Sequence, residues 1–481
     1  MQKKFLGNLL FIILLNLLIK PIYIFGIDLQ IQNIVGAEDY GMYFSLLNFS
    51  FLFNMFLDIG ITNYNTKNTA QYPHAVSKYM SSFLGVKIVL IFLYTFITIG
   101  FALLVGYSDK EMYILSFFII NQIMVGIIQY LRSNFAGLHL FKIDAILSVM
   151  DRFLLILFTS LLLYGNILHK PFQIEWFIYL QTLTYFLTLI TAIILTGIKI
   201  GKLRVHIKKT FSIAILKRSF PFALLILLMM LYTRIDSVMI ERMLPNGKEQ
   251  AGIYAQGFRL LDALNMFAFL VAGLLLPVFS RIIRENKPIQ PILQMSSKLL
   301  IGTTFVISIG LAIYANLVIS KIYHEHIETA STIFFWLVLC FIPLSFSHIF
   351  STLLTANNNL RQLNQMAIAG IIVNVGLNYT LIPIMGAEGA AIATLFTQTT
   401  MAIIQVLLVL KVFKFHIHWD SIIRFFILIC IVCICAIESK INIDNQFFGL
   451  LISIGVGSIL LFVLKLFNVK DFLLLIKTKS E

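Results

Sequence analysis

Long apolar stretches follow one another along almost the whole chain, and the connections between them are short. At the length of a membrane-spanning helix, about 20 residues, the sequence holds about fourteen such stretches. They lie near residues 6–27, 41–62, 79–106, 112–133, 143–164, 173–198, 213–240, 252–280, 298–320, 331–355, 364–384, 387–410, 419–437 and 446–467. No connection is long enough for a water-soluble domain. We therefore predict an all-α polytopic membrane protein that acts in or at the bilayer.

Composition and the first residues agree with that class. Apolar residues make up 59% of the chain and charged residues only 12%, against about 25% charged residues in soluble domains. Lys3 and Lys4 precede the first apolar run, as in a signal peptide. That run has no small-residue cleavage site, so we expect an uncleaved first helix.

The basic residues are unevenly distributed between the two sides of the membrane. The net charge of +14 would by itself suggest a nucleic-acid partner. If the N-terminus is cytoplasmic, however, cytoplasmic loops and ends carry 25 of the 36 Lys and Arg residues and the opposite side carries six. This asymmetry follows the positive-inside rule. It predicts cytoplasmic N- and C-termini and no nucleic-acid partner.

Two predicted outer turns share a sequence pattern. Residues 36–43 read GAEDYGMY and residues 247–254 read GKEQAGIY, so both contain Gly-x-Glu followed by Gly-x-Tyr. The spacing corresponds to six helices and predicts a parallel repeat, although turns favour glycine and acidic residues in any case. We therefore predict a six-helix bundle at 1–198, a basic cytoplasmic linker at 199–212, a second six-helix bundle at 213–413, and helices 13 and 14 with a cytoplasmic tail at 414–481.

Five basic residues fall inside predicted spans: Lys20, Lys87, Arg152, Arg234 and Arg259. A cation inside the membrane costs about 2.5–3.5 kcal/mol even on lenient insertion scales. A chain that retains several of them is expected to build a polar cavity within a helix bundle. Positive charge in such a cavity indicates an anionic cargo.

The segment 370–394 carries a motif. It reads Asn374-x3-Asn378-x3-Ile382-Pro383-x2-Gly386-Ala-x-Gly389-Ala-Ala and resembles the pattern of bacterial polysaccharide exporters. These belong to the multidrug–oligosaccharidyl-lipid–polysaccharide (MOP) exporter superfamily, which includes multidrug and toxin extrusion (MATE) transporters and the lipid II flippase. Residues 36–60 and 234–260 resemble the helix 1–2 and helix 7–8 hairpins of the same proteins. The resemblance implies a MATE-like fold with two bundles around a central cleft, and a cargo of sugar repeat units on a polyprenyl diphosphate.

Under this resemblance the cations become candidates for binding the diphosphate. Helical rise from the predicted outer ends places Arg234, Arg259 and Lys20 about 10 Å below the outer surface, with Arg152 nearer the middle. We predict that these four form a basic collar, because guanidinium groups match phosphate oxygens two at a time. Lys87 lies nearer the cytoplasmic side, where it could line the cleft or extend to the surface.

Acidic and amide side chains leave alternatives open. Asp236 and Asp262 lie at depths that would let them pair with Arg259 and Arg234 instead. We expect Asp151 not to face Arg152, because adjacent residues diverge on a helix. Asp58 could carry a coupling H⁺ or Na⁺ or could be a packing residue. One turn apart, Asn374 and Asn378 could line the cleft or join helices by hydrogen bonds.

We therefore predict a flippase for undecaprenyl-diphosphate-linked oligosaccharide, an O-antigen or capsule repeat unit. It would act in the cytoplasmic (inner) membrane of a bacterium, in lipopolysaccharide or capsule biosynthesis, as a monomer beside a polysaccharide polymerase and other assembly proteins. We expect no catalysis, no metal site and no cofactor beyond a coupling ion. The alternatives are a lipid II flippase, a multidrug or cation antiporter, which would favour an acidic cleft, and a membrane glycosyltransferase or polymerase. The last would need a sizeable outer loop, and the longest one predicted, 28–40, is short.

Overall fold

The fold is helical throughout the part of the chain that the computed structural model describes: residues 15–16, 18–72, 74, 76–165, 171–201, 209–415 and 419–466. The chain divides into two compact units, Met1–Glu241 and Arg242–Glu481. The elements of the first unit are η1 (Ile24–Asp28), α2 (Leu29–Leu52), η2 (Asn54–Leu57), α3 (Ile61–Gln71), α4 (Val76–Val105), α5 (Asp109–Gly137), α6 (Phe141–Leu147), α7 (Met150–Tyr164), α8 (Ile174–Lys199) and α9 (Lys209–Met243). Those of the second are α10 (Gly247–Arg284), α11 (Gln290–Ile313), α12 (Ala315–Ile322), α13 (Ile327–Leu339), α14 (Phe341–Ala356), α15 (Leu360–Met385), α16 (Ala387–Phe413), α17 (Trp419–Asn442) and α18 (Gln446–Val463).

Twelve helical segments among the described residues are long and apolar enough to cross a membrane. They run in order from Met80–Val105 to Gln446–Val463 and coincide with the third to fourteenth predicted spans. The all-α polytopic class is thereby confirmed. The first two predicted spans are not among the twelve, so the total of fourteen and the cytoplasmic position of the termini stay predictions.

The predicted connection at 28–40 is wrong. Those residues are helical, and the chain turns at a single position, Gly36, with φ 78° and ψ 173°. Glycine reaches this region of positive φ without the steric penalty that a Cβ brings. The first helix therefore extends to Val35, and the second begins at Ala37 rather than at 41. The predicted connection at 63–78 is also largely helical, because α3 occupies most of it.

Helix α9 belongs, up to Glu241, to the first unit, whereas the segment 213–240 was predicted to belong to the second bundle. Two side-chain contacts tie it to α2. Asn48 Nδ2 donates to Ser237 Oγ at 3.0 Å, and Ser45 Oγ donates to the Glu241 carboxylate. The division into compact units thus follows Glu241. Residues 202–208 of the predicted linker lie outside the described residues, and the predicted bounds of the two bundles and the linker stay predictions.

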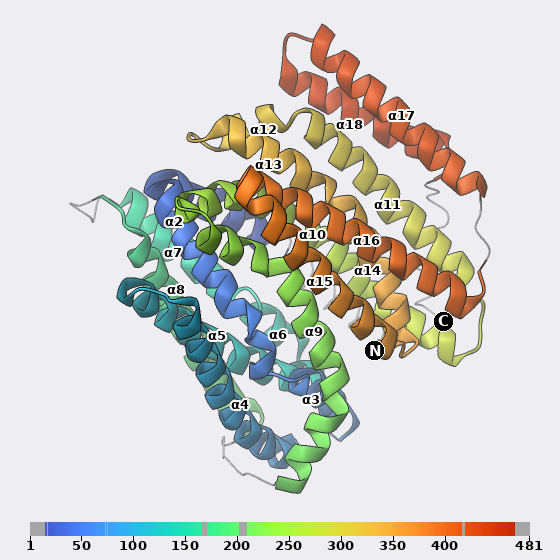
Figure 1. Cartoon of the computed structure of the whole chain (residues 1–481). Helices are drawn as coiled ribbons and strands as arrows, with labels where there is room; N and C mark the ends of the chain where they lie inside the picture. The colour runs from blue at the N-terminus through green and yellow to red at the C-terminus, as the bar shows by residue number, and fades with distance from the viewer. Residues whose placement is uncertain are drawn as a thin grey trace. The chain divides into compact units, whose positions relative to one another are not determined.

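Helices α17 and α18 pack against each other and against α11 in the second unit, as Figure 1 shows. Their shared core contains Val306, Val432 and Leu461. At one end the Tyr314 hydroxyl lies 2.9 Å from Ser439 Oγ. The last two helices, predicted as an addition to the bundles, are therefore anchored to α11 by an apolar core and a buried hydrogen bond.

Candidate functional site

Arg152 is the centre of a polar cluster in the first unit. It lies in the first turn of α7, and its Nη1 donates to the Tyr185 hydroxyl on α8 at 2.8 Å. Its guanidinium carbon lies 5.0 Å from the ring centroid of Tyr23 and 5.7 Å from that of Tyr185. Flanking rings attract the cation and fix its orientation. The guanidinium is thus held in place while its side chain remains 30% exposed.

Other charges lie close to Arg152. Lys20 interacts electrostatically with Arg152, Asp151 and Arg132. Arg132 Nε donates to Asp144 at 2.7 Å, which joins α5 to α6. The expectation that Asp151 does not face Arg152 is wrong: its carboxylate lies 3.4 Å from Nη1. A long arginine side chain can bend back along the first helical turn, which Cα positions alone do not reveal. The cluster holds three cations and two carboxylates.

Lys20 does not share its depth with the other predicted collar residues. Because the first helix continues to the turn at Gly36, Lys20 lies about 24 Å from its outer end. The observed helix ends place Arg234 about 14 Å and Arg259 about 18 Å from theirs. The equal depth of about 10 Å predicted for all three is therefore wrong for Lys20 in particular. It lies instead beside Arg152, near the cytoplasmic end under the predicted topology.

Lys87 and Asp58 form an ion pair where the second helix is interrupted. Lys87 Nζ also donates to the Leu57 carbonyl oxygen at 3.0 Å, and Thr62 N–H donates to Asp58 at 3.2 Å. Ile59 and Gly60 take positive φ between η2 and α3, so the regular helical hydrogen-bond pattern is broken here. Lys87 is 2% exposed and therefore does not reach the membrane surface. Its contacts satisfy the interrupted backbone, which hydrocarbon could not do.

Four predicted residues are divided between the units. Arg234 and the buried Asp236 lie on α9 in the first unit, and the half-buried Arg259 and Asp262 lie on α10 in the second. Arg234 and Asp236 each make interactions in the structure, as do Arg259 and Asp262. The predicted cross-pairing between the two helices, and their part in a collar, stay predictions.

Asn374 and Asn378 are fully buried on α15, and neither is exposed to solvent. Asn378 Nδ2 donates to Asn374 Oδ1 at 3.1 Å, one turn away on the same helix. At the end of this helix, Gly386 turns the chain into α16 with φ 63°. The motif thus builds a buried amide pair and a tight helix–helix turn, and in this conformation the amides line no open surface.

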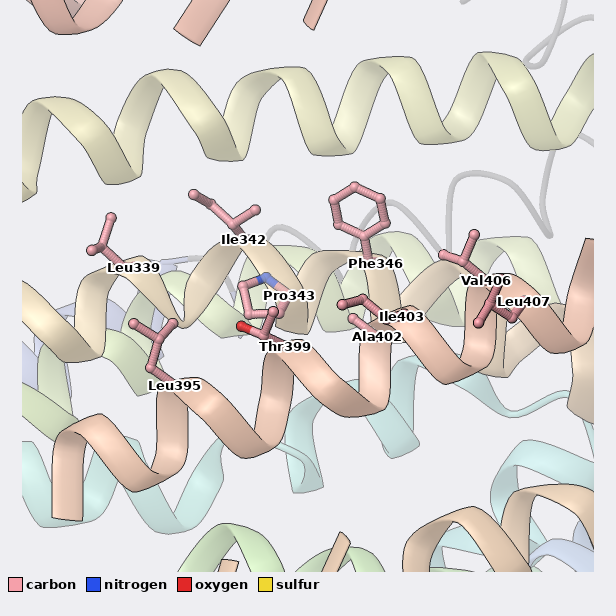
Figure 2. Close-up of a pocket in the computed structure, with 10 residues that line it drawn as sticks. All are labelled: Leu339, Ile342, Pro343, Phe346, Leu395, Thr399, Ala402, Ile403, Val406 and Leu407. Atoms are coloured by element: carbon pink, nitrogen blue, oxygen red, sulfur yellow. The ribbon is translucent and has the colours of Figure 1, made fainter. Parts of the chain in front are cut away.

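An apolar pocket of about 510 Å³ lies between α14 and α16 (Figure 2). Its lining residues are Leu339, Ile342, Pro343, Phe346, Leu395, Thr399, Ala402, Ile403, Val406 and Leu407. Thr399 contributes the one side-chain oxygen of this set. Phosphate and sugar hydroxyls would lose their hydrogen bonds here, so the pocket suits hydrocarbon and not a polar head group.

The first unit's cluster includes residues that the sequence did not single out. Arg132 was counted among loop charges, and the rings of Tyr23 and Tyr185 gave no signal in a chain with 18 Tyr residues. Tyr185 lies 33 residues from Arg152, so the pair becomes visible only when α7 and α8 are packed.

Comparison with known proteins assigns the family. A model of the family described as "Polysaccharide biosynthesis protein" matches residues 5–283. This chain belongs to that family. No curated protein matches this member at a significant level. It is a multi-pass membrane protein of polysaccharide biosynthesis, as the sequence motifs predicted.

Solved structures show the fold of this family member. One is the "Lipid II flippase MurJ, inward closed conformation", with a TM-score of 0.72, 16% identity, and coverage of 96% of this chain and 97% of that one. Another is an inward-facing multidrug resistance MATE transporter of the MOP superfamily, with a TM-score of 0.60, 14% identity, and coverage of 82% and 92%. A third, a MOP superfamily transporter from Pyrococcus furiosus described by the reverse polarity of its binding pocket, has a TM-score of 0.56, 15% identity, and coverage of 84% and 94%. The predicted MOP fold is confirmed, and the proteins that share it are transporters and a flippase rather than enzymes.

Proposed function

We propose that this protein flips an undecaprenyl-diphosphate-linked oligosaccharide, an O-antigen or capsule repeat unit, from the cytoplasmic to the outer leaflet of a bacterial inner membrane. The observation that carries the proposal is the cluster of Lys20, Arg132 and Arg152 in a polysaccharide-biosynthesis protein with a flippase fold. Three cations face two carboxylates there. Surplus positive charge inside an otherwise apolar bundle is expensive unless an anion uses it.

The geometry of Arg152 suits a diphosphate. Tyr185 and Tyr23 hold the guanidinium against two rings, so little side-chain freedom is lost when phosphate oxygens bind. Charge-assisted hydrogen bonds to phosphate are about twice as strong as neutral ones. Lys20 adds a second donor close by. The two bundles would then reorient around the bound head group while the polyprenyl tail stays in hydrocarbon.

Net transport toward the outer leaflet requires an energy source. It would come from the membrane potential, from a coupling H⁺ or Na⁺, or from removal of the cargo by a polymerase. Asp58 is the carboxylate nearest a break in a helix, but Lys87 neutralises it in this conformation. Asp236 and Asp262 are the other candidates for a coupling site. We place no further cofactor in the mechanism, and we propose a monomer.

Reconstituted transport tests the proposal. Proteoliposomes that carry a fluorescent undecaprenyl-diphosphate oligosaccharide would be assayed for its exposure to a membrane-impermeant quencher. We expect Arg152→Gln to slow flipping about 10- to 100-fold, the loss of one charge-assisted contact. The control is Arg281→Gln, because the Arg281 side chain is 54% exposed and its guanidinium pairs with Glu285. If Arg152→Gln flips the lipid at the wild-type rate, the cluster does not take part in transport.

A lipid II flippase is the second candidate, favoured by the 0.72 TM-score to a protein of that name. Both cargoes carry the same lipid and diphosphate, so the group attached to the diphosphate separates them. Deletion of the gene in its host distinguishes the two, because surface polysaccharide is lost in one case and cell-wall synthesis stops in the other. A cation antiporter is disfavoured by the basic cluster. Loss of drug resistance with normal surface polysaccharide would establish it instead.

A further inference from the structure

The turn between α12 and α13 is fastened to α10 in the second unit. The Tyr323 hydroxyl donates to the Gln256 main-chain oxygen at 3.2 Å, and Gln256 Nε2 donates to the Glu325 main-chain oxygen at 3.4 Å. His326 completes the turn as the N-cap residue of α13, with φ 53°. Positive φ is uncommon for a residue with a Cβ and persists where neighbouring contacts hold it. The turn is therefore fixed by its contacts with α10.

A further contact joins two side chains that can carry opposite charges. His326 Nε2 lies 3.4 Å from Glu249 Oε1, in the first turn of α10. Asn246 Nδ2 donates to the other carboxylate oxygen of Glu249 at 3.4 Å, which restricts the orientation of the carboxylate. The side chains of His326 and Glu249 are 36% and 38% exposed. Protons from the solvent therefore reach both members of the pair.

The same end of the second unit carries two more links between helices. Gln250 Oε1 on α10 accepts from the Ala387 main-chain N–H at the start of α16, at 3.3 Å. Trp336 Nε1 on α13 donates to Glu388 Oε1 on α16 at 3.0 Å. Helices α10, α13 and α16 are thus linked in a closed ring. Of these links, the one through His326 contains the group whose charge ordinarily changes between pH 5 and 8.

We propose that His326 and Glu249 form a proton-sensitive clasp that holds the α12–α13 turn on α10. A neutral imidazole attracts the carboxylate weakly, whereas an imidazolium makes a charge-assisted contact with it. Protonation would therefore close the clasp and stiffen this end of the second unit, which is the outer end under the predicted topology. The clasp does not depend on which cargo the protein carries.

Other charged and titratable groups lie on the elements around the turn. They are Arg242 at the end of α9, Lys248 on α10, Lys321 on α12, His324 and Glu325 in the turn, Glu328 on α13 and Glu388 on α16. These groups are the same in wild type and in a variant of the clasp. A comparison of the two proteins at one pH therefore isolates the contribution of the pair.

Hydrogen exchange of the full chain in nanodiscs tests the clasp. The Ala330 N–H donates to the His326 main-chain oxygen at 2.9 Å, so its exchange reports on opening of the turn. At about pH 5.5 we expect His326→Asn to raise exchange at Ala330 about 2- to 5-fold, the effect of an exposed ion pair. At about pH 8, where the imidazole is neutral, variant and wild type should exchange alike. His324→Asn is the matched control: it removes the other imidazole of the turn and should exchange as wild type does at both pH values.

Glu249→Gln separates an ion pair from simple packing of the imidazole. If the two side chains act together, Glu249→Gln should match His326→Asn at the lower pH, and the double variant should exchange no faster than either. Wild-type exchange of His326→Asn at the lower pH, an equal increase at both pH values, or additive effects in the double variant would overturn the clasp. No lipid transport is measured, so failure of the clasp leaves the proposed function untouched.

Discussion

Replacing Lys87 by methionine should destabilise the first unit far more than the loss of an exposed cation. The Lys87 side chain is 3% exposed and supports two acceptors, the Asp58 carboxylate and the Leu57 carbonyl oxygen. Methionine fills a similar volume, so packing is largely kept. The substitution removes the positive charge that pairs with Asp58. It also removes the hydrogen-bond donor to the Leu57 carbonyl oxygen at the interruption of the helix.

The size of the effect follows from what remains buried. Removing one partner of a buried ion pair costs about 3–5 kcal/mol of unfolding free energy, because the other charge is left uncompensated. The Asp58 side chain is 29% exposed, so water partly solvates its uncompensated charge. We therefore expect a loss of unfolding free energy of about 3 kcal/mol, the lower limit of that range. At about 2–4 °C per kcal/mol for a unit of this size, the unfolding midpoint of Lys87→Met should fall by about 6–12 °C.

Thermal unfolding in detergent, followed by intrinsic fluorescence, measures the shift. Lys110→Met is the matched control: its ammonium lies 3.1 Å from Glu175 but is 61% exposed, so its loss should cost at most about 1 kcal/mol. The double variant with Asp58→Asn removes both charges and should regain most of the loss. If Lys87→Met falls no further than Lys110→Met, the structural role is refuted. If transport stops at an unchanged midpoint, Lys87 is a functional cation.

Two glycine substitutions test the close packing of the second unit by the same thermal assay. A Cβ on Gly389 would meet a main-chain carbonyl oxygen of α15 at 2.4 Å, whereas one on Gly376 would meet nothing within 4 Å. We expect Gly389→Ala to cost at least about 1–3 kcal/mol, and a midpoint equal to that of Gly376→Ala would contradict this. A Cβ on Gly457 would lie 2.6 Å from a methyl group of Val306, whereas Gly455 on the same helix has open space. Gly457→Leu should therefore loosen α18 from α11 and increase its hydrogen exchange, and Gly455→Leu should not; equal exchange in both would show that α18 is held elsewhere.

Hydropathy predicted the third to fourteenth spans because a membrane helix is a local property of about 20 residues. It misplaced the connection at 28–40 for a reason that is not local. Asp28, Glu38 and Asp39 look like a loop, yet Asp28 is buried and accepts a hydrogen bond from Tyr40 at 2.9 Å. Its partner lies across the turn at Gly36. Tertiary contacts stabilise polar residues in a helix, and a hydropathy window cannot see them.

The sequence identifies most cations of the candidate site, because a charged residue inside an apolar span is energetically costly and therefore rare. It does not identify the residues that these cations contact. Lys87 and Asp58 are 29 residues apart, and Arg152 and Tyr185 are 33 apart. The predicted depth of Lys20 is wrong because the first helix continues to the turn at Gly36. Partners and depths depend on helix packing, which the sequence pattern does not specify.

A buried cation that is paired with a carboxylate is structural. Cations that outnumber the neighbouring carboxylates are candidates for binding an anion. Lys87 is buried and contacts the Asp58 carboxylate and the Leu57 carbonyl oxygen, so an anion would have to displace Asp58 and leave its charge uncompensated. Lys20, Arg132 and Arg152 share two carboxylates, and the Arg152 side chain stays 30% exposed. An incoming phosphate completes that cluster without stranding a charge. Binding of a diphosphate should therefore begin at the Arg152 cluster, and Lys87 should hold the interrupted second helix in place.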